Sequence, residues 1–323
     1  MVELPALADV LDRMHVVALP MRVRFRGITT REVALIEGPA GWGEFGAFPE
    51  YGPPEASAWL AAALEAAYTE LPAPRRTRIP VNATVPAVDA VAVPEVLARF
   101  PGARTAKVKV AEPGQALAED IARVAAVRAQ IPTVRVDANG GWTVEQAVHA
   151  LTALTRDGAL EYAEQPCTTV EELVQVRRQL PEVPIAADES IRRVSDPLRV
   201  ARAGAADVAV LKVAPLGGVT ALLDIATQIG MPVVISSALD SAVGIGIGLR
   251  AAAALPVLEY ACGLGTGGFF VQDVADAPAP EGGYLAVESF TPDPARLTDL
   301  AAPTDRRDWW MERVADCYPL LNR

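Results

Sequence analysis

All three lysines of the chain and three of its acids lie where short apolar segments end. The lysines are Lys107, Lys109 and Lys212, among 29 basic residues in total. The acids are Asp137, Glu164 and Asp188, which are spaced 27 and 24 residues apart. Lys212 follows Asp188 after another 24 residues. Each interval is about the length of one strand–helix unit, so these side chains are expected at the same end of neighbouring parallel strands. A single acid at a strand end is more often a helix cap or a surface ion pair, so the prediction depends on the joint pattern.

These residue types predict a particular chemistry. Three neighbouring carboxylates raise one another's pKa unless a cation lies between them, and ligation by oxygen alone favours Mg²⁺, with Mn²⁺ as a substitute. Lys107 and Lys109 are two residues apart on a strand and point to one face, where a neighbouring ammonium and a metal lower the pKa and make one lysine a general base. Lys212 lies four strands further on and faces them across the barrel. A base, a metal and an opposing cation predict proton abstraction next to a carboxylate.

The segment from about residue 80 to 275 carries these groups and is predicted to be one α/β barrel. Short apolar segments alternate with amphipathic stretches of helical composition, which is typical of repeated βα units. Strands are expected at 81–85, 106–110, 133–139, 160–165, 184–189, 207–213, 232–238 and 258–263. Eight parallel strands close most economically as a TIM-like barrel, with the loops that follow the strands meeting at one mouth.

The two ends of the chain predict a separate α+β unit. Residues 14–37 alternate apolar and polar side chains, as antiparallel strands do, and a Gly-rich turn at 38–54 and an alanine-rich helix at 55–70 follow. After residue 275 the chain becomes rich in Pro and Gly, and its tail is expected to pack back on the N-terminal unit. We therefore predict a capping domain from 1–79 and 276–323, and a barrel from 80–275.

Composition excludes several classes of function. The net charge is −11, so no broad cationic surface is available for nucleic acid or for an anionic membrane. The odd, widely spaced cysteines (Cys167, Cys262 and Cys317) argue against disulfides, and two histidines, His15 and His149, are too few for a zinc site of the usual kind. Two GxGxxG matches, at 41–46 and 263–268, open no long helix and do not predict nucleotide binding. We expect a cytoplasmic enzyme with a small carboxylate substrate, no nucleic-acid or membrane partner and no obligate protein partner.

At the same residues the sequence resembles the enolase superfamily, in its muconate-cycloisomerase-like branch, over almost the whole chain. The matching motifs are AKVKV at 106–110, VDANGGW at 136–142, EQP at 164–166, DES at 188–190 and LK at 211–212. The resemblance implies a (β/α)7β barrel with an α+β capping domain. It implies that Asp137, Glu164 and Asp188 bind Mg²⁺ with Asn139 in support, and it selects Asp188 rather than the adjacent Glu189. It also implies that Lys109 is the base, that Lys107 lowers the pKa of Lys109 and touches the substrate carboxylate, and that Lys212 stabilises charge from the opposite side.

Within the branch, ISSALDSAVG at 235–244 and GLGT at 263–266 are most similar to the o-succinylbenzoate synthase family of menaquinone biosynthesis. That resemblance implies a magnesium-dependent lyase that dehydrates 2-succinyl-6-hydroxy-2,4-cyclohexadiene-1-carboxylate to 2-succinylbenzoate by syn elimination. Substrate contacts are expected from Ser236, Ser237, Gly263 and Gly265. Further contacts are expected from the capping loops at 20–27 and 43–51. In the first of these loops, arginines 22, 24 and 26 alternate, so at most one face could reach a succinyl carboxylate.

Other functions would use the same residues. Racemisation of N-succinylamino acids requires the same two opposed lysines and a similar succinyl pocket, either as the main reaction or as a second activity. Dipeptide epimerisation and muconate cycloisomerisation also share the metal site, although dipeptide epimerases usually carry acids after the eighth strand, where this chain has CGLGTGG. A non-catalytic ligand-binding barrel would be expected to lack one of the three lysines or acids, and none is missing.

Overall fold

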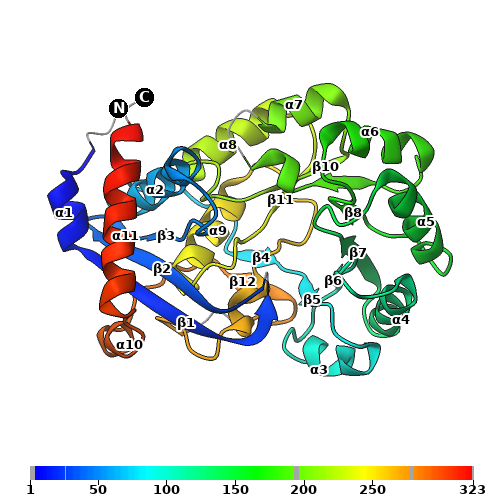
Figure 1. Ribbon diagram of the computed structural model, residues 1–323, viewed down its shortest axis with the longest axis horizontal. Coiled ribbons are helices and arrows are strands. Elements are labelled where there is room, and N and C mark those ends of the chain that lie inside the picture. Colours follow the sequence, from blue (N-terminus) through cyan, green and yellow to red (C-terminus); the bar gives the residue numbers. More distant parts are fainter. Residues whose placement is uncertain (1–3, 26, 193–195, 277–278, 322–323) are drawn as a thin grey trace.

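The computed structural model describes residues 4–25, 27–192, 196–276 and 279–321, and a curved parallel sheet lies at its centre (Figure 1). Seven strands form this sheet in the spatial order β11-β10-β9-β8-β7-β6-β5. They are β5 (Ala83–Val85), β6 (Thr105–Lys109), β7 (Thr133–Asp137), β8 (Ala163–Glu164), β9 (Ile185–Ala187), β10 (Val208–Leu211) and β11 (Val233–Ile235). Each overlaps a segment that the sequence predicts to be a strand.

The eighth predicted strand, at 258–263, is wrong in extent, because this segment is reduced to two isolated parallel bridges. Cys262 pairs with Val81 on one side, and Gly263 pairs with Ser236 on the other. Backbone hydrogen bonds from Cys262 to Pro80 and from Gly263 to Ile235, of 2.7 and 2.8 Å, join both edges of the sheet. The sheet therefore closes into a barrel, as predicted, although its eighth strand is short. Pro256 comes just before this segment and the glycines from 263 to 268 just after it, and neither residue type favours an extended strand.

Helices follow the strands and cover the outside of the barrel (Figure 1). They are α3 (Val93–Leu97), α4 (Leu117–Arg128), α5 (Val144–Leu154), α6 (Val170–Gln179), α7 (Asp196–Ala203), α8 (Val219–Gln228) and α9 (Ala242–Ala254). Thr143 and Thr169 begin α5 and α6 as N-caps, each paired with a Gln or Glu three residues later. These caps end the loops at fixed points and leave the residues just after each strand at the barrel mouth.

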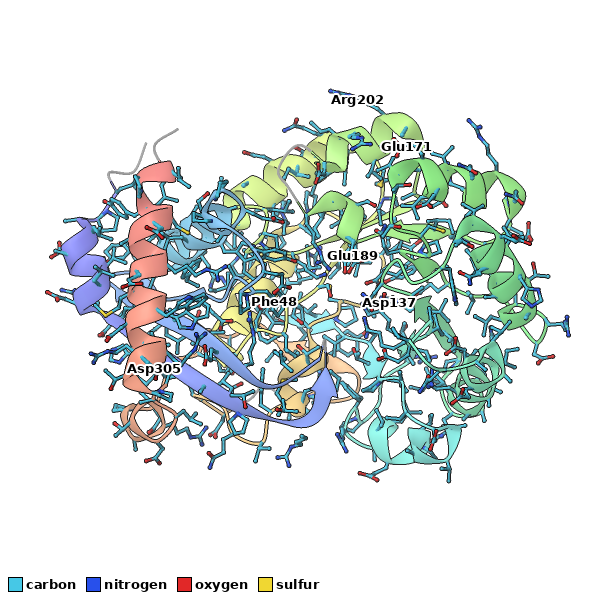
Figure 2. The ribbon with its side chains drawn as sticks, viewed as in Figure 1. Phe48, Asp137, Glu171, Glu189, Arg202 and Asp305 are labelled. Atoms are coloured by element: carbon cyan, nitrogen blue, oxygen red, sulfur yellow. The ribbon has the colours of Figure 1, made fainter. Side chains whose placement is uncertain are left out.

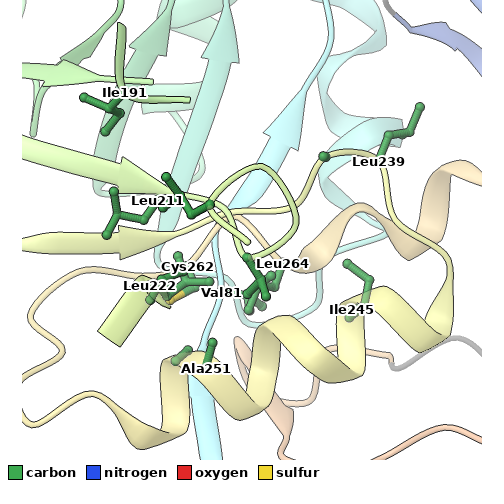
Figure 3. Close-up of a cluster of buried hydrophobic side chains, with 14 of the residues drawn as sticks. Val81, Ile191, Leu211, Leu222, Leu239, Ile245, Ala251, Cys262 and Leu264 are labelled. Carbon is green, nitrogen blue, oxygen red and sulfur yellow. The ribbon is translucent and has the colours of Figure 1, made fainter. Parts of the chain in front are cut away.

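The core lies in two layers that follow from strand alternation. Tyr162, Ala186, Val208, Val210 and Val234 form a small apolar cluster of their own inside the barrel. The neighbouring strand residues pack outward against the helices in a much larger cluster (Figure 3). In that view Ala251 and Ile245 of α9 point toward the segments that carry Val81, Cys262 and Leu264. Because both faces of the strands are buried, the strands read as nearly continuous apolar segments.

The N-terminal segment forms an antiparallel sheet of β1 (Met14–Phe25), β2 (Ile28–Gly38) and β3 (Gly41–Phe45), covered by α2 (Pro53–Tyr68). The sequence predicts a Gly-rich turn from residue 38, and this is wrong for the residues of β3. A Cβ atom on Gly43 would lie 1.9 Å from the carbonyl oxygen of Ala63 in α2. The glycine is therefore a site where helix and strand backbones approach closely, and it does not mark a turn.

The C-terminal tail lies against this N-terminal sheet. The Ala18 amide donates to the Leu300 carbonyl at 2.8 Å, and α11 (Thr304–Cys317) packs on α2. The two other short helices at the chain ends are α1 (Leu7–Asp12) and α10 (Pro294–Asp299), while β12 (Tyr284–Ala286) pairs with β4 (Arg78–Pro80). Helices α1 and α11 lie on the same side of the molecule in Figure 1. No helix in the described ranges has the length and apolar composition needed to cross a membrane.

Candidate active site

A cavity lies between the carboxyl ends of the barrel strands and the N-terminal segment. Its barrel side includes Lys107, Lys109, Asp137, Asp188 and Lys212. Three aromatic side chains, Phe48, Tyr51 and Trp59, cover it from the N-terminal segment. Figure 2 shows Phe48 opposite Asp137 near the centre of the molecule. Barrel and N-terminal segment therefore share one site.

The strand order brings the three predicted acids together. β7, β8 and β9 are neighbours, and Asp137 pairs directly with Glu164 in the sheet register. Lys109 at the end of β6 pairs with Asp137, and Asp188 follows β9 immediately. The adjacency expected from the 27- and 24-residue intervals is thus confirmed.

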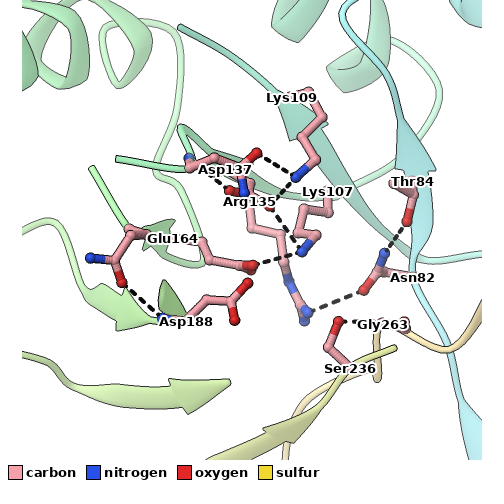
Figure 4. Close-up of polar contacts among 12 residues, drawn as sticks. Asn82, Thr84, Lys107, Lys109, Arg135, Asp137, Glu164, Asp188, Ser236 and Gly263 are labelled. Carbon is pink, nitrogen blue, oxygen red and sulfur yellow. Dashed lines mark hydrogen bonds and ion pairs between the residues drawn. The ribbon is translucent and has the colours of Figure 1, made fainter. Parts of the chain in front are cut away.

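Each of the three carboxylates contacts a lysine. Figure 4 shows the contacts of Asp137 and Glu164 with Lys109 and Lys107. Lys109 Nζ donates to Asp137 Oδ2 at 2.5 Å, and Lys107 Nζ lies 3.1 Å from the same oxygen. Lys107 Nζ also donates to Glu164 Oε1 at 2.7 Å. Lys212 Nζ donates to both oxygens of Asp188 at 2.5 Å. Lys107 and Lys109 share one face of β6, as their spacing predicts.

Burial and like charge give the three acids different pKa values. Burial and the charge of Asp137 raise the pKa of Glu164 to about 7, against the opposing effect of Lys107. Burial also acts to raise the pKa of Asp137, but Lys109 and Lys107 outweigh it and hold that pKa far below its usual range. At Asp188 burial again acts to raise the pKa, and Lys212, Arg192 and Lys107 together lower it. The middle acid of the row is therefore the one that most readily takes a proton.

The carboxylates around Lys107 decide its pKa, which lies well above its usual value. The expectation that two ammoniums near a metal lose basicity concerns the metal-bound site and stays a prediction. Burial acts to lower this pKa, but the carboxylates of Glu164 and Asp137 outweigh burial. In this arrangement the nearest charges to Lys107 are negative, which stabilises its protonated form.

The loops after β7 and β8 hold the acids through unusual backbone conformations. Asn139 and Gln165 have φ angles of 47° and 39°, in the left-handed region that few residues other than glycine adopt. The Gln165 side chain accepts hydrogen bonds from the amides of Asp188 and Ser190, at 3.0 and 3.1 Å. The Asn139 amide donates to Asp137 Oδ1 at 3.0 Å. Such strained positions persist where surrounding contacts determine the geometry, as they do at functional sites.

The donor set fits a hard divalent cation. Asp137, Glu164 and Asp188 offer oxygen atoms alone, and Glu164 Oε2 is buried without a hydrogen-bond partner among the described residues. In the described part of the chain no three His, Cys, Asp or Glu side chains are grouped as metal ligands, because each of these acids turns to a lysine. The chemistry of the three acids therefore suits Mg²⁺, while their side-chain directions in this structure are those of ion pairs.

Three of the four residues predicted to touch substrate line the cavity, and one does not. Ser236, Ser237 and Gly263 are part of its wall, and Ser237 Oγ lies 2.8 Å from Thr266 Oγ1. Gly265 lies behind the wall, where a Cβ atom would be 3.1 Å from the Phe100 ring. Gly265 itself is not part of the cavity wall, whereas Thr266 next to it is. A contact between Gly265 and substrate stays a prediction.

The predicted capping loops have different outcomes. The loop at 43–51 supplies Phe48 and Tyr51 to the cavity. In the loop at 20–27, Arg22 Nε donates to the carbonyl of Phe270 at 3.0 Å, and its side chain is exposed away from the cavity. The Arg24 side chain and Arg26 lie outside the described residues.

Among the residues of the cavity wall that sequence reasoning missed are Trp59 and Arg192. Trp59 lies on the apolar face of α2 and could not be told from a core residue. Arg192 follows the DES motif in the 3₁₀ turn that begins at Glu189. Its Nη1 donates to the Tyr51 hydroxyl at 2.9 Å, and its Nη2 donates to Glu189. The sequence signal that could have found it is its position four residues after Asp188, in the loop after the strand.

Comparison with known proteins places the chain in a family. Residues 92–292 match the family model described as enolase C-terminal domain-like, and residues 16–67 match the enolase N-terminal domain-like model. The chain is 72% identical over 317 residues to the o-succinylbenzoate synthase of Mycobacterium marinum, covering 98% of this chain and 97% of that protein. It is 71% identical over 317 residues to the protein of the same name from Mycolicibacterium smegmatis, covering 98% of each. The chain belongs to the enolase superfamily, among its o-succinylbenzoate synthases.

Solved structures of the enolase superfamily share the fold of the chain. Muconate lactonizing enzyme from Pseudomonas fluorescens, solved with muconolactone, superposes with a TM-score of 0.77 at 22% identity, covering 90% of this chain and 98% of that one. An enolase and putative sugar isomerase from Streptomyces coelicolor gives a TM-score of 0.74 at 22% identity, covering 91% and 96%. The predicted fold class, a TIM-like barrel with an α+β capping region, is confirmed.

Proposed function

We propose that this chain dehydrates 2-succinyl-6-hydroxy-2,4-cyclohexadiene-1-carboxylate to 2-succinylbenzoate, as a lyase of menaquinone biosynthesis that uses Mg²⁺. The relatives named o-succinylbenzoate synthase, 71–72% identical over nearly the whole chain, support this reaction over others of the superfamily. The observation that carries the chemistry is the row of three acids on neighbouring strands, with Lys109 at one end and Lys212 at the other.

Asp137, Glu164 and Asp188 would hold Mg²⁺, and Mn²⁺ could replace it. Asn139 would support the site through its contact with Asp137. The partnerless Glu164 Oε2 and the raised pKa of that residue support a cation here, because both reflect a buried carboxylate whose negative charge Lys107 compensates only in part. When bound, the ion would stabilise the negative charge that develops on the substrate carboxylate.

The lysines would perform the proton transfers. Lys109, as a neutral amine, would remove the proton alpha to the ring carboxylate, and the electron pair of that C–H bond would move into the carboxylate. The pair would then return to form the ring double bond as the C–O bond to the ring hydroxyl breaks. The proton held by Lys109 would pass to the departing oxygen, releasing water and leaving an aromatic ring. Proton removal and hydroxyl departure on one face require one residue to act first as base and then as acid.

The other charged residues would orient the substrate. Lys107, held between Glu164 and Asp137, would stay protonated and contact the ring carboxylate. Lys212 would place its ammonium on the opposite ring face, where a cation–π contact stabilises the forming ring. Phe48, Tyr51 and Trp59 would cover the ring from the N-terminal segment and exclude water.

Racemisation of N-succinylamino acids is the second candidate, because the cavity contains lysines on both sides of the acid row. Two opposed lysines could remove a proton from one face of an α-carbon and return it to the other. In dehydration of the cyclohexadiene acid, by contrast, Lys109 performs both proton transfers, and Lys212 contributes only its positive charge.

The test gives the purified protein with Mg²⁺ both substrates in parallel. Absorbance follows formation of the aromatic product, and NMR follows exchange of the α-hydrogen of an N-succinylamino acid with deuterated water. We expect dehydration that chelator abolishes and that added Mg²⁺ or Mn²⁺ restores. Exchange without dehydration would refute the synthase proposal and favour the racemase.

A further inference from the structure

A continuous chain of polar contacts connects the N-terminal segment with Lys109. It consists of Tyr51, Arg192, Glu189, Asn139 and Lys109, and we refer to it as the relay. Arg192 Nη1 donates to the Tyr51 hydroxyl at 2.9 Å, and Arg192 Nη2 donates to Glu189 Oε1. Asn139 Nδ2 donates to the same Glu189 oxygen at 3.2 Å, and Lys109 Nζ donates to Asn139 Oδ1 at 2.7 Å. Figure 2 shows Glu189 between the segment around Phe48 and the strand end at Asp137.

Each contact of the relay fixes the orientation of the next group. Because the Asn139 amide donates to Glu189 with its nitrogen, its oxygen is turned toward Lys109. Glu189 is held in turn by Arg192, whose side chain is 17% exposed and also lies 3.7 Å from Asp188. A guanidinium can hold several acceptors in one plane, whereas an ammonium cannot. The orientation of Asn139 therefore depends on where Arg192 is held.

The Tyr51 end of the relay is itself held firmly. Arg313 of α11 donates to the carbonyls of Phe48 and Tyr51, each at 2.7 Å. The Tyr51 ring packs against Phe48 and Trp59, with centroid distances of 6.1 and 6.0 Å. The hydroxyl of Tyr51 is thus a fixed acceptor that the N-terminal segment presents to the barrel.

We propose that Tyr51 and Arg192 are positioning residues for the base Lys109, acting through Glu189 and Asn139. Proton abstraction would then be efficient only when the segment from Phe48 to Tyr51 is seated on the barrel mouth. The proposal rests on the proposed function for the role of Lys109. A lysine has a flexible four-carbon stem, so a base of this type depends on neighbouring acceptors to bring Nζ within hydrogen-bond reach of the substrate hydrogen.

The test compares Tyr51→Phe, Arg192→Lys and the double variant. Tyr51→Phe keeps the ring that packs on Phe48 and Trp59 and removes the hydroxyl alone. We expect kcat to fall about fivefold in Tyr51→Phe, as for one lost hydrogen bond, and between about tenfold and a hundredfold in Arg192→Lys, as for a misplaced catalytic group. KM should stay within about twofold, because the interaction acts on the transition state. The double variant should be no slower than Arg192→Lys, since both changes break one chain of contacts.

A second readout separates positioning from a loss of folding. With substrate deuterated alpha to the carboxylate, the isotope effect on kcat should be larger in both variants than in the wild-type chain, because proton abstraction becomes slower relative to other steps. Matched controls are Arg199→Lys, whose side chain pairs with Glu171 on the outer surface, and Tyr284→Phe on β12. Both controls should keep the wild-type kcat and isotope effect.

Three results would overturn the relay. The first is Tyr51→Phe with wild-type kcat and isotope effect. The second is a raised KM at unchanged kcat in Arg192→Lys, which would assign Arg192 to binding of a substrate carboxylate. The third is full additivity of the effects of the two substitutions in the double variant.

If the wild-type chain fails to dehydrate the cyclohexadiene acid, the proposed function fails independently of the relay. The same variant-to-wild-type ratios are then measured on α-hydrogen exchange of the N-succinylamino acid.

Discussion

Glu44 on β3 is predicted to make the stability of the protein fall as pH rises. Its buried carboxylate caps the start of α9, accepting from the amides of Ser241 and Gly244 at 3.1 and 3.2 Å and from the Ser241 hydroxyl. Burial and the charge of Asp240 raise the pKa of Glu44 to about 8, with Ser241 and Arg31 opposing and the more distant Asp273 adding. Glu44 thus connects the N-terminal sheet to a barrel helix. At this buried position water cannot stabilise the negative charge of its carboxylate.

The size of the effect follows from the two pKa values. The carboxyl has its ordinary pKa of 4.5 in the unfolded chain and a pKa of about 8 in the folded one. Between these values the folded state keeps a proton that the unfolded state has released, so the stabilisation is complete below pH 4.5 and is lost as pH rises toward 8. Because a pKa unit corresponds to slightly more than 1 kcal/mol, the loss from pH 5.5 to 7.5 is about 3 kcal/mol.

Urea unfolding of the wild-type chain and of Glu44→Gln at pH 5.5 and 7.5 measures this loss. Glutamine has the shape of the protonated acid and cannot ionise, so the pH dependence of the variant should be smaller by about 3 kcal/mol. Taking the difference between the two proteins removes the effect of other buried acids such as Asp273, whose pKa is raised to about 6 by burial. An exposed control, Glu145→Gln on α5, should leave the pH dependence unchanged. Equal pH dependence in the wild-type chain and in Glu44→Gln would refute the assignment.

Three further outcomes follow from the site and the fold. Lys109→Ala and Lys212→Ala should each abolish dehydration measured by absorbance, and a near-normal rate in either would contradict the mechanism. Glu164→Gln should weaken Mg²⁺ binding measured by calorimetry without substrate, by at least about tenfold, because one carboxylate charge is removed from the row; unchanged affinity would exclude Glu164 as a ligand. Gly43→Ala should lower the free energy of unfolding by several kcal/mol, because its methyl group would lie 1.9 Å from the Ala63 oxygen; a loss below about 1 kcal/mol in urea unfolding would show that the helix shifts freely.

The barrel and its row of acids could be predicted because both follow from the regular alternation of strands and helices along the sequence. One strand–helix unit has a nearly constant length, so residues such as Asp137, Glu164 and Asp188 had to fall on neighbouring strands once the barrel was inferred. The length of the eighth strand was predicted wrongly because its apolar residues, including Cys262, resemble a full strand. Proline before this segment and glycines after it limit its pairing to two bridges. Strand β3 was not predicted because a glycine such as Gly43, which allows close contact with a helix, cannot be told in the sequence from a glycine in a turn.

The sequence by itself determined which residue types meet at the barrel mouth, because strand period and unit length decide that locally. It also indicated the reaction class, since among basic residues lysine can lose its proton near neutral pH and arginine cannot. The family resemblance indicated that the loop at 43–51 covers the mouth, and tertiary structure alone decided which contacts hold it there. Tyr51 and Arg192 are 141 residues apart, and their contact depends on how α11 and α2 seat the N-terminal segment on the barrel. Contacts of that kind come from packing between distant segments, and no periodicity in the chain encodes them.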